Sequence, residues 1–235
     1  MFKLKYVFFD CWDTVIQLKE KFPHSAIKAI YDHVINKENI FYDEMIKEDE
    51  DFLKYYFDNA TFDVNQEALI AYMCELHNLK LDISYKEASY LSSMAFEAPL
   101  IPGVKKFLAF LKENNIGCSI LSNSIQAPEH TVELVARNFE KIPFDYILSS
   151  SYYAVRKPDP RFYNLLANKV GVDLANVAFI GDSISSDIAG ANAANVGFCG
   201  YFNWKNKPGN KKYHYYEFKS YDELETELKK YLWNQ

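Results

Sequence analysis

The sequence predicts a doubly wound α/β fold: a mostly parallel, Rossmann-like sheet core, with a small all-helical domain inserted after the first strand. Three observations carry this prediction. In the second half of the chain, short apolar runs alternate with segments of helical periodicity, the order typical of parallel sheets with helices on both faces. Only helical patterns occur between the first apolar run and residue 98. The 235 residues, 49% of them hydrophobic, suffice for a sizeable core.

The first strand is predicted at Tyr6-Val7-Phe8-Phe9, an uninterrupted apolar run that suits a strand buried on both faces. Asp10 follows at its carboxyl end, where open α/β sheets bind ligands. Residues 17–98 then carry four segments whose apolar residues lie three and four positions apart, which predicts a bundle of four helices. We therefore expect an α/β core made of residues 1–16 and 99–235 and a helical domain of residues 17–98.

The core resumes with a helix through Val104 to Leu111, and Gly117 then precedes a strand at Cys118 to Leu121. Asp159-Pro160 supplies a helix N-cap followed by proline at the first helical position, which predicts a helix start. The other expected elements are a helix through 132–139, strands at 146–148 and 177–180, a helix through 188–194, strands near 196–199 and 213–218, and a helix at 222–232.

The charge distribution excludes several classes of partner. The net charge is −6, and residues 17–98 hold 16 acidic residues against 8 lysines and no arginine, so the sequence shows no basic surface for nucleic acid. The acidic run Glu48-Asp49-Glu50-Asp51 lies in a helical pattern and predicts a solvated face. No apolar run approaches the roughly 20 residues that a bilayer requires, so no membrane association is expected.

Four cysteines lie far apart, without a CxxC pair, at Cys11, Cys74, Cys118 and Cys199. This spacing favours reduced thiols in the cytoplasm. The sequence gives no indication of the oligomeric state.

Polar residues follow several predicted strands, as a site at the edge of a doubly wound sheet requires. Asp10 and Asp182, at the carboxyl ends of two strands, offer the hard oxygen ligands that Mg²⁺ prefers. Ser122, Asn123 and Lys157 offer hydrogen-bond donors and a positive charge for phosphoryl oxygens. Taken singly, each has a structural alternative: the aspartates as helix N-caps, Ser122 as a turn former, Lys157 as a solvated charge. Asp187 could cap its helix, bind a metal-bound water or pair with Lys157.

These motifs together resemble the haloacid dehalogenase-like hydrolase superfamily over nearly the whole chain. The matching stretches, in chain order, are Phe8-Phe9-Asp10-Cys11-Trp12-Asp13-Thr14, Ile120-Leu121-Ser122-Asn123, Arg156-Lys157-Pro158-Asp159-Pro160 and Phe179-Ile180-Gly181-Asp182-Ser183 with Asp187. The resemblance implies a helical cap, which residues 17–98 fit.

In phosphatase members of that superfamily, the residue at Asp10 is the nucleophile and forms an aspartyl-phosphate. The resemblance further implies that Asp10, the backbone carbonyl of Trp12, Asp182 and Asp187 hold Mg²⁺, while Ser122 and Lys157 hold the phosphate. We expect Trp12, Thr14 and Asn123 to contact the substrate, a small-molecule phosphate ester.

The sequence departs from the superfamily pattern at Trp12. Phosphatases usually carry there a second aspartate that protonates the leaving oxygen, and an indole cannot shuttle protons. Loss of a general acid/base costs about 10²- to 10⁴-fold in rate. Asp13 is not an evident substitute, because its side chain should point away from that of its neighbour. Trp12 instead predicts an aromatic wall under the cap.

Two other functions stay open. The 2-haloacid dehalogenases use carboxylate attack on carbon without a metal, and Trp12 and Tyr163 fit their pattern. Against this, they lack the Gly181-Asp182 pair, and their substrate site uses an arginine from the early cap, where this chain has none. A binding or regulatory protein that kept the phosphate pocket but lost turnover is the other alternative, which the intact Asp10, Lys157 and Asp182 oppose.

Overall fold

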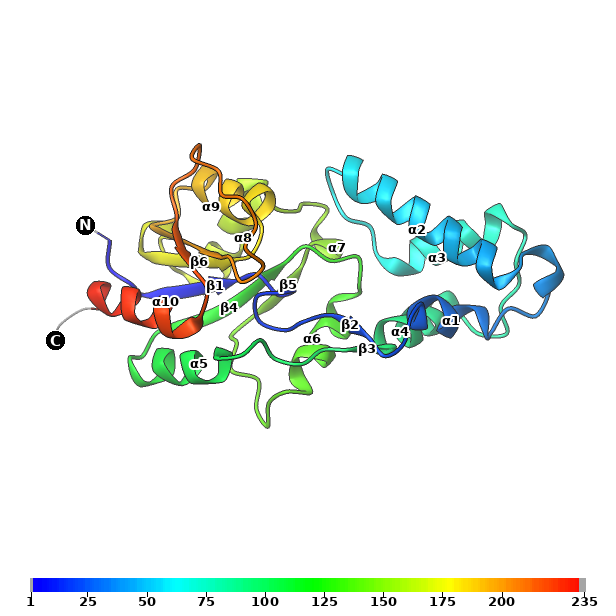
Figure 1. The fold of residues 1–235 in the computed structure, drawn as a ribbon, viewed down its shortest axis with the longest axis horizontal. Helices are drawn as coiled ribbons and strands as arrows, with labels where there is room; N and C mark the ends of the chain where they lie inside the picture. Colours follow the sequence, from blue (N-terminus) through cyan, green and yellow to red (C-terminus); the bar gives the residue numbers. More distant parts are fainter. Residues whose placement is uncertain (1, 233–235) are drawn as a thin grey trace.

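The computed structural model describes residues 2–232 and contains a six-stranded sheet in the order β5-β4-β1-β6-β7-β8 (Figure 1). Every pairing in it is parallel. The strands are β1 (Tyr6–Phe9), β4 (Gly117–Ser122), β5 (Ile147–Ser149), β6 (Val177–Gly181), β7 (Phe198–Phe202) and β8 (Tyr216–Phe218). β1 lies between β4 and β6 and is wholly buried, as its apolar run predicts. The doubly wound α/β prediction is confirmed.

Helices cover both faces of this sheet (Figure 1). On one face the core includes side chains of Val7 and Phe9 together with those of α5 (Val104–Glu113), α6 (Pro128–Ala136) and α10 (Tyr221–Leu228). On the other face Phe8 and Phe179 pack against α8 (Pro160–Val170) and α9 (Ala189–Ala193). The short helix α7 (Ser150–Tyr153) follows β5 directly.

Four helices follow the first strand, where the sequence predicts them. They are α1 (Ser25–Tyr31), α2 (Tyr42–Asn59), α3 (Gln66–Leu76) and α4 (Tyr85–Met94). Figure 1 shows them projecting from one end of the sheet. They enclose a hydrophobic cluster of their own around Ile30, Met45 and Cys74. We call residues 17–98 the helical insert.

A two-stranded antiparallel ribbon joins the helical insert to the core, a feature that the sequence did not predict. β2 (Lys19–Glu20) pairs with β3 (Phe96–Glu97). The backbone N–H of Gln17 donates to the carbonyl of Pro99 at 2.8 Å, which continues the pairing toward the core. The chain therefore enters and leaves the insert at one place.

Several predicted element limits are wrong, because backbone groups find other partners. The strand expected near 196–199 begins only at Phe198, since the N–H groups of Val196 and Gly197 donate to Ala191 and Leu174. The strand expected from Tyr213 begins at Tyr216. The helix expected through 132–139 ends at Ala136, and a short π-helical turn (Ile184–Ile188) precedes α9. Of the expected core, residues 1 and 233–235 lie outside the described residues.

Within the described residues, no helix is both long enough and apolar enough to cross a membrane. All four cysteines are buried and unpaired.

Candidate active site

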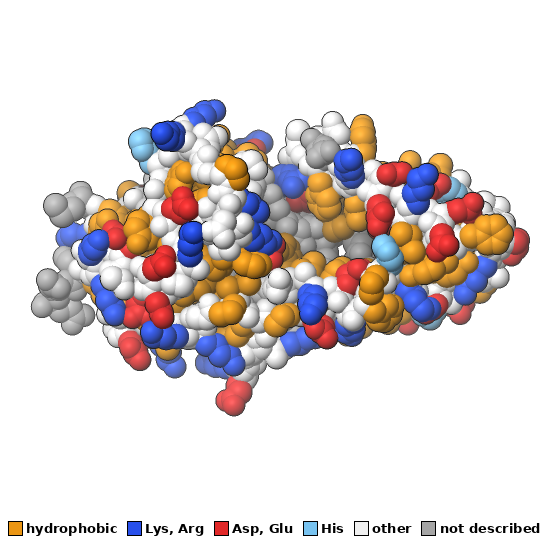
Figure 2. All heavy atoms as spheres, viewed as in Figure 1, with side chains coloured by type: hydrophobic (Ala, Val, Ile, Leu, Met, Phe, Trp, Pro, Cys, Tyr) orange, Lys and Arg blue, Asp and Glu red, His pale blue; other side chains and the backbone are white. Residues whose placement is uncertain are grey.

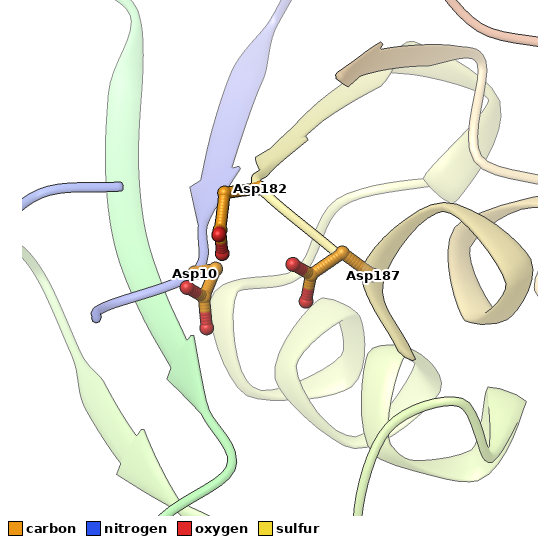
Figure 3. A group of neighbouring side chains, drawn as sticks. All are labelled: Asp10, Asp182 and Asp187. Atoms are coloured by element: carbon orange, nitrogen blue, oxygen red, sulfur yellow. The ribbon is translucent and has the colours of Figure 1, made fainter. Parts of the chain in front are cut away.

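Three carboxylates converge at the carboxyl edge of the sheet. Asp10 follows β1 and Asp182 follows β6, and these strands are neighbours. The backbone N–H of Asp10 donates to the carbonyl of Ile180 at 2.8 Å, which extends the strand pairing to the candidate nucleophile. Asp187 comes from the π-helical turn beyond β6. Figure 3 shows the three side chains gathered together, with that of Asp187 directed toward the other two, and one oxygen of each lies within 4.8 Å of the others.

Lys157 places its ammonium group inside this cluster. Its Nζ donates to Oδ1 of Asp10 at 2.5 Å and lies 2.7 Å from Oδ1 of Asp187. The residue is 2% exposed, so both ion pairs are largely shielded from water. Asn123 holds the backbone of Lys157: its Nδ2 donates to the lysine carbonyl and its Oδ1 accepts from the lysine N–H, both at 2.8 Å. The Asn123 side chain thus fixes the position of Lys157.

The buried charges shift one another's pKa values. Burial is the main cause that raises the pKa of Asp10, Lys157 opposes the rise, and the carboxylates of Asp187 and Asp182 add to it, so that the pKa is about 7. Burial and Asp187 likewise raise the pKa of Asp182. Burial alone would lower the pKa of Lys157, but Asp10 and Asp187 raise it above its usual range, so the lysine is a cation. Such shifts mark a site with more negative charge than its single buried cation neutralises.

The local chain positions Asp187 closely. Its Oδ2 accepts from the N–H of Ser183 at 3.0 Å, and its carbonyl accepts from the Tyr163 hydroxyl at 2.8 Å. Gly181 leaves room for it, because a Cβ at that position would collide with the Asp187 carboxylate. Asp187 pairs with Lys157 and is also one of the three clustered carboxylates, so of the roles left open by the sequence the ion pair is observed and metal binding stays a prediction. Tyr163 is fully buried and uses its hydroxyl for this backbone contact.

The remaining sequence-predicted residues surround the cluster. Ser122 is fully buried at the end of β4. Thr14 is also fully buried, and its Oγ1 has no hydrogen-bond partner among the described residues. Trp12 is half-buried and lines a cavity that extends into the helical insert.

Two lysines that sequence reasoning missed approach the site from the loop after β7. Lys207 Nζ lies 3.4 Å from Oδ2 of Asp182, and Lys205 pairs with the side chain of Asp13. The sequence could have indicated them, because β7 is also a parallel strand and the loop after it therefore leaves the sheet at the same edge as Asp10 and Asp182. The Asp13 carboxylate is thus engaged in an ion pair with Lys205, which agrees with the expectation that Asp13 is not an evident substitute for the acid missing at Trp12.

A second missed feature ties the helical insert to the loops of the site. Asp63, between α2 and α3, is 3% exposed and lies 3.1 Å from Nη1 of Arg156, the neighbour of Lys157. The Ser150 hydroxyl donates to the same carboxylate and accepts from the N–H of Ser124 at 2.9 Å. An insert residue therefore contacts the segment that carries Lys157 directly and is linked to the segment that carries Ser122 through Ser150.

The cavity that Trp12 lines has a volume of about 500 Å³ and lies among the helices of the insert. It reaches the core at Trp12 and Asn123, and the Asn123 side chain holds the backbone of Lys157, whereas no carboxylate of the cluster is among its described lining residues. Figure 2 shows the molecule hollowed between core and insert, with hydrophobic side chains gathered on the insert. This volume is within the range of small-molecule sites.

The carboxylate cluster has the chemistry of a divalent-cation site. Asp10, Asp182 and Asp187 supply hard oxygen atoms close together, and a cation among them would offset both the burial and the mutual repulsion that raise the pKa values of Asp10 and Asp182. A carboxylate beside a cation, with a buried lysine for an anionic group, can also act as a nucleophile toward an electrophile brought to it.

Comparison with known proteins places these features in a family. A family model described as haloacid dehalogenase-like hydrolase matches residues 4–195. A glyceraldehyde 3-phosphate phosphatase of Pyrococcus furiosus is 25% identical, over 98% of this chain and 88% of its own. An (S)-2-haloacid dehalogenase of a Pseudomonas species is 27% identical, over 64% of this chain and 61% of its own.

The same fold occurs in a crystal structure of a HAD phosphatase from Thermococcus onnurineus. It aligns with a TM-score of 0.66 and 19% identity, over 96% of this chain and 98% of its own.

Proposed function

This chain belongs to the haloacid dehalogenase-like hydrolases, and we propose that it is a magnesium-dependent phosphatase of small phosphate esters. The single observation that carries the proposal is Lys157, buried between Asp10 and Asp187 at the edge of a three-carboxylate cluster. Phosphoryl transfer needs this mixture, because the nucleophile and the phosphoryl oxygens are both anionic. The phosphatase named among the relatives supports the same reaction class.

Asp10 is the proposed nucleophile. One of its carboxylate oxygens attacks phosphorus, the ester oxygen leaves with the bonding electron pair, and an aspartyl-phosphate forms. Water then attacks the phosphorus of that intermediate, which releases inorganic phosphate and frees Asp10. Lys157 and Ser122 hold the phosphoryl oxygens in this scheme, and the Asn123 side chain keeps Lys157 in place.

Asp10, Asp182, Asp187 and the backbone carbonyl of Trp12 would hold Mg²⁺. When bound, the ion supplies positive charge to the phosphoryl oxygens. Lys207, 3.4 Å from Asp182, is a nearby cation of this chain and therefore affects how strongly the carboxylates attract a second one.

The proton for the leaving oxygen has no evident donor at Trp12. Its indole lines the cavity instead, which suits it to contact the leaving group. Leaving groups that need no protonation are therefore the favoured substrates, which makes aryl phosphates better than alkyl phosphates.

A 2-haloacid dehalogenase is the second candidate, favoured by Trp12 and by the named dehalogenase relative. Two observations oppose it. The Tyr163 hydroxyl contacts the backbone of Asp187 and Ser186 rather than facing the site, and the helical insert contains no arginine for a substrate carboxylate.

The test is a panel of phosphate esters, assayed for phosphate release with Mg²⁺ and with a chelator, beside 2-chloropropionate assayed for chloride release. Phosphate release that requires Mg²⁺ supports the proposal. Chloride release that persists in chelator overturns it in favour of the dehalogenase. Phosphate binding without either product identifies a binding protein.

The proposed setting is the cytoplasm, because four buried, unpaired cysteines fit a reducing compartment. The acidic helical insert also disfavours nucleic acids as partners.

A further inference from the structure

The cavity inside the helical insert has walls that are mainly apolar. Side chains of α1, α2 and α3 form most of its surface, with Trp12 where it meets the core. The apolar lining residues include Ile27, Ile30, Met45, Leu53, Phe57, Leu69, Ile70 and Met73. An apolar group of aromatic size would bury its surface against these side chains. Each Å² of apolar surface removed from water stabilises binding by about 25 cal/mol.

One polar group of the core beside the cavity lacks a hydrogen-bond partner. Gln126 lines the cavity and is 5% exposed, yet its Oε1 has no hydrogen-bond partner among the described residues. A buried acceptor without a partner loses the free energy of its hydrogen bonds to water.

The charged side chains around the cavity are acidic. Glu20, Glu48, Asp49 and Glu50 line it, while no lysine or arginine is among the described lining residues, and His24 is the one base there. The run at 48–51 was predicted to be a solvated face, and Glu48, Glu50 and Asp51 are exposed as predicted, whereas Asp49 is half-buried.

Three of the four acids already have partners. The Glu20 carboxylate accepts from the N–H of His24, Glu48 pairs with His77, and Glu50 lies 3.7 Å from His24. Asp49, half-buried on α2, has neither a hydrogen bond nor an ion pair within residues 2–232. It is therefore the carboxylate whose charge a ligand can balance.

We propose that this cavity binds the leaving-group half of the substrate, and that this half is an apolar, aromatic-sized alcohol carrying a protonated amine. The amine pairs with Asp49, the apolar body contacts α1 to α3, and the oxygen that bears phosphate lies toward Trp12 and Asn123. The inference rests on the proposed phosphatase function, since it names the substrate class of that site.

Burial and the neighbouring Glu50 and Glu20 raise the pKa of Asp49 to about 7, with His24 opposing the rise. Burial is the larger cause of this shift, and a protonated amine beside Asp49 would oppose it by favouring the ionised carboxylate.

The first test compares three phosphate esters that differ in one remote group. They are 4-(2-aminoethyl)phenyl phosphate, 4-ethylphenyl phosphate and 4-(2-carboxyethyl)phenyl phosphate, whose phenol leaving groups are alike in size and acidity. We expect kcat/KM to fall in that order, with the amine ahead of the carboxylate by about tenfold or more. Equal kcat/KM values for the three esters, with phosphate released from each, would overturn the cavity assignment and leave the phosphatase function standing.

The second test uses two matched variants of α2. Asp49→Asn should remove the advantage of the amine ester over 4-ethylphenyl phosphate. Asp51→Asn changes an exposed carboxylate two residues away that does not line the cavity, and it should keep that advantage. If both variants kept it, Asp49 would not be the amine site.

Calorimetric titration with tyramine, the free alcohol of the amine ester, separates binding from turnover. We expect tyramine to bind the whole protein more tightly than 4-ethylphenol does, and Asp49→Asn to weaken it. Such binding without cleavage of any ester would support the cationic site and contradict the phosphatase proposal. Equal binding of the two alcohols would contradict the site itself.

Discussion

The ammonium nitrogen of Lys157 lies 2.7 Å from Oδ1 of Asp187, and this ion pair is almost completely buried. Because the same ammonium also bonds Asp10, Lys157→Met would leave two buried carboxylates without their cation. We expect a loss of about 3 to 5 kcal/mol in the free energy of unfolding, measured by urea denaturation. The exposed Lys141→Met serves as control. Equal midpoints for the two variants would show that the buried pair contributes nothing.

Asp10→Asn should abolish turnover while leaving the fold intact. The amide is nearly isosteric and its oxygen can still accept from Lys157, but it is a poor nucleophile. We expect kcat to fall by about 10³-fold or more. Phosphate-release kinetics beside a thermal melt make the measurement, and full activity in a well-folded variant would refute the nucleophile assignment.

Removing the charge of Asp182 and removing that of its neighbour Lys207 should shift the Mg²⁺ concentration for half-maximal activity in opposite directions. Asp182→Ala removes a proposed ligand and should raise the Mg²⁺ concentration for half-maximal activity by about tenfold or more. Lys207→Gln removes the ammonium 3.4 Å from that carboxylate and should lower it. A magnesium titration of both variants checks the pair, and a shift in the same direction would contradict the assigned ligand.

The identity of residue 12 should govern the leaving-group dependence. With no acid there, turnover by the natural protein should rise steeply with leaving-group acidity, and the aspartyl-phosphate should accumulate, because its hydrolysis lacks a base. Trp12→Asp should help alkyl phosphates more than aryl ones. Rates across esters of graded leaving-group acidity measure this. A flat dependence in the natural protein would mean that another group supplies the proton.

Asp49 should make stability depend on pH. Its pKa in the folded protein, about 7, lies above its ordinary value of 3.8, so between these values the folded state binds more protons than the unfolded state. The free energy of unfolding therefore falls as pH rises from about 4 to about 7. Asp49→Asn should match the natural protein near pH 4 and exceed it by at most about 4 kcal/mol at pH 8.

Denaturant titrations at both pH values measure this difference, with the exposed Asp51→Asn as control. A pH-independent difference would show that Asp49 ionises normally. When ionised, Asp49 lowers the stability of the protein and has no ion-pair partner among the described residues. Binding of a cationic ligand would account for a carboxylate at this position.

The sheet and the carboxylate cluster could be predicted because their signals are local. An apolar run such as Tyr6 to Phe9 specifies a buried strand, and a polar residue at its end is carried to the sheet edge by the topology alone. Asp10 and Asp182 are therefore brought together by two strand ends that pair.

What could not be predicted depends on tertiary packing. β2 and β3 are two residues each, too short for any periodic pattern. Asp49 lies in a run of four acids, and which of them turns inward depends on how α2 meets the other helices. The ion pair of Asp63 with Arg156 joins residues far apart in the sequence through the docking of the insert on the core.

The ribbon of β2 and β3 has a topological consequence. The two connections between core and insert, β2 and β3, run side by side. The insert is therefore attached to the core in the way that the tip of a long hairpin is attached to its two strands, whatever the length of the insert. Lengthening a loop whose ends are already fixed costs only a logarithmic entropy term. Helices can therefore be gained, lost or exchanged between Glu20 and Phe96 over evolutionary time without moving β1 relative to α5. In the proposed phosphatase, the residues of the carboxylate cluster and most of those that line the cavity would thus lie on separable pieces of chain.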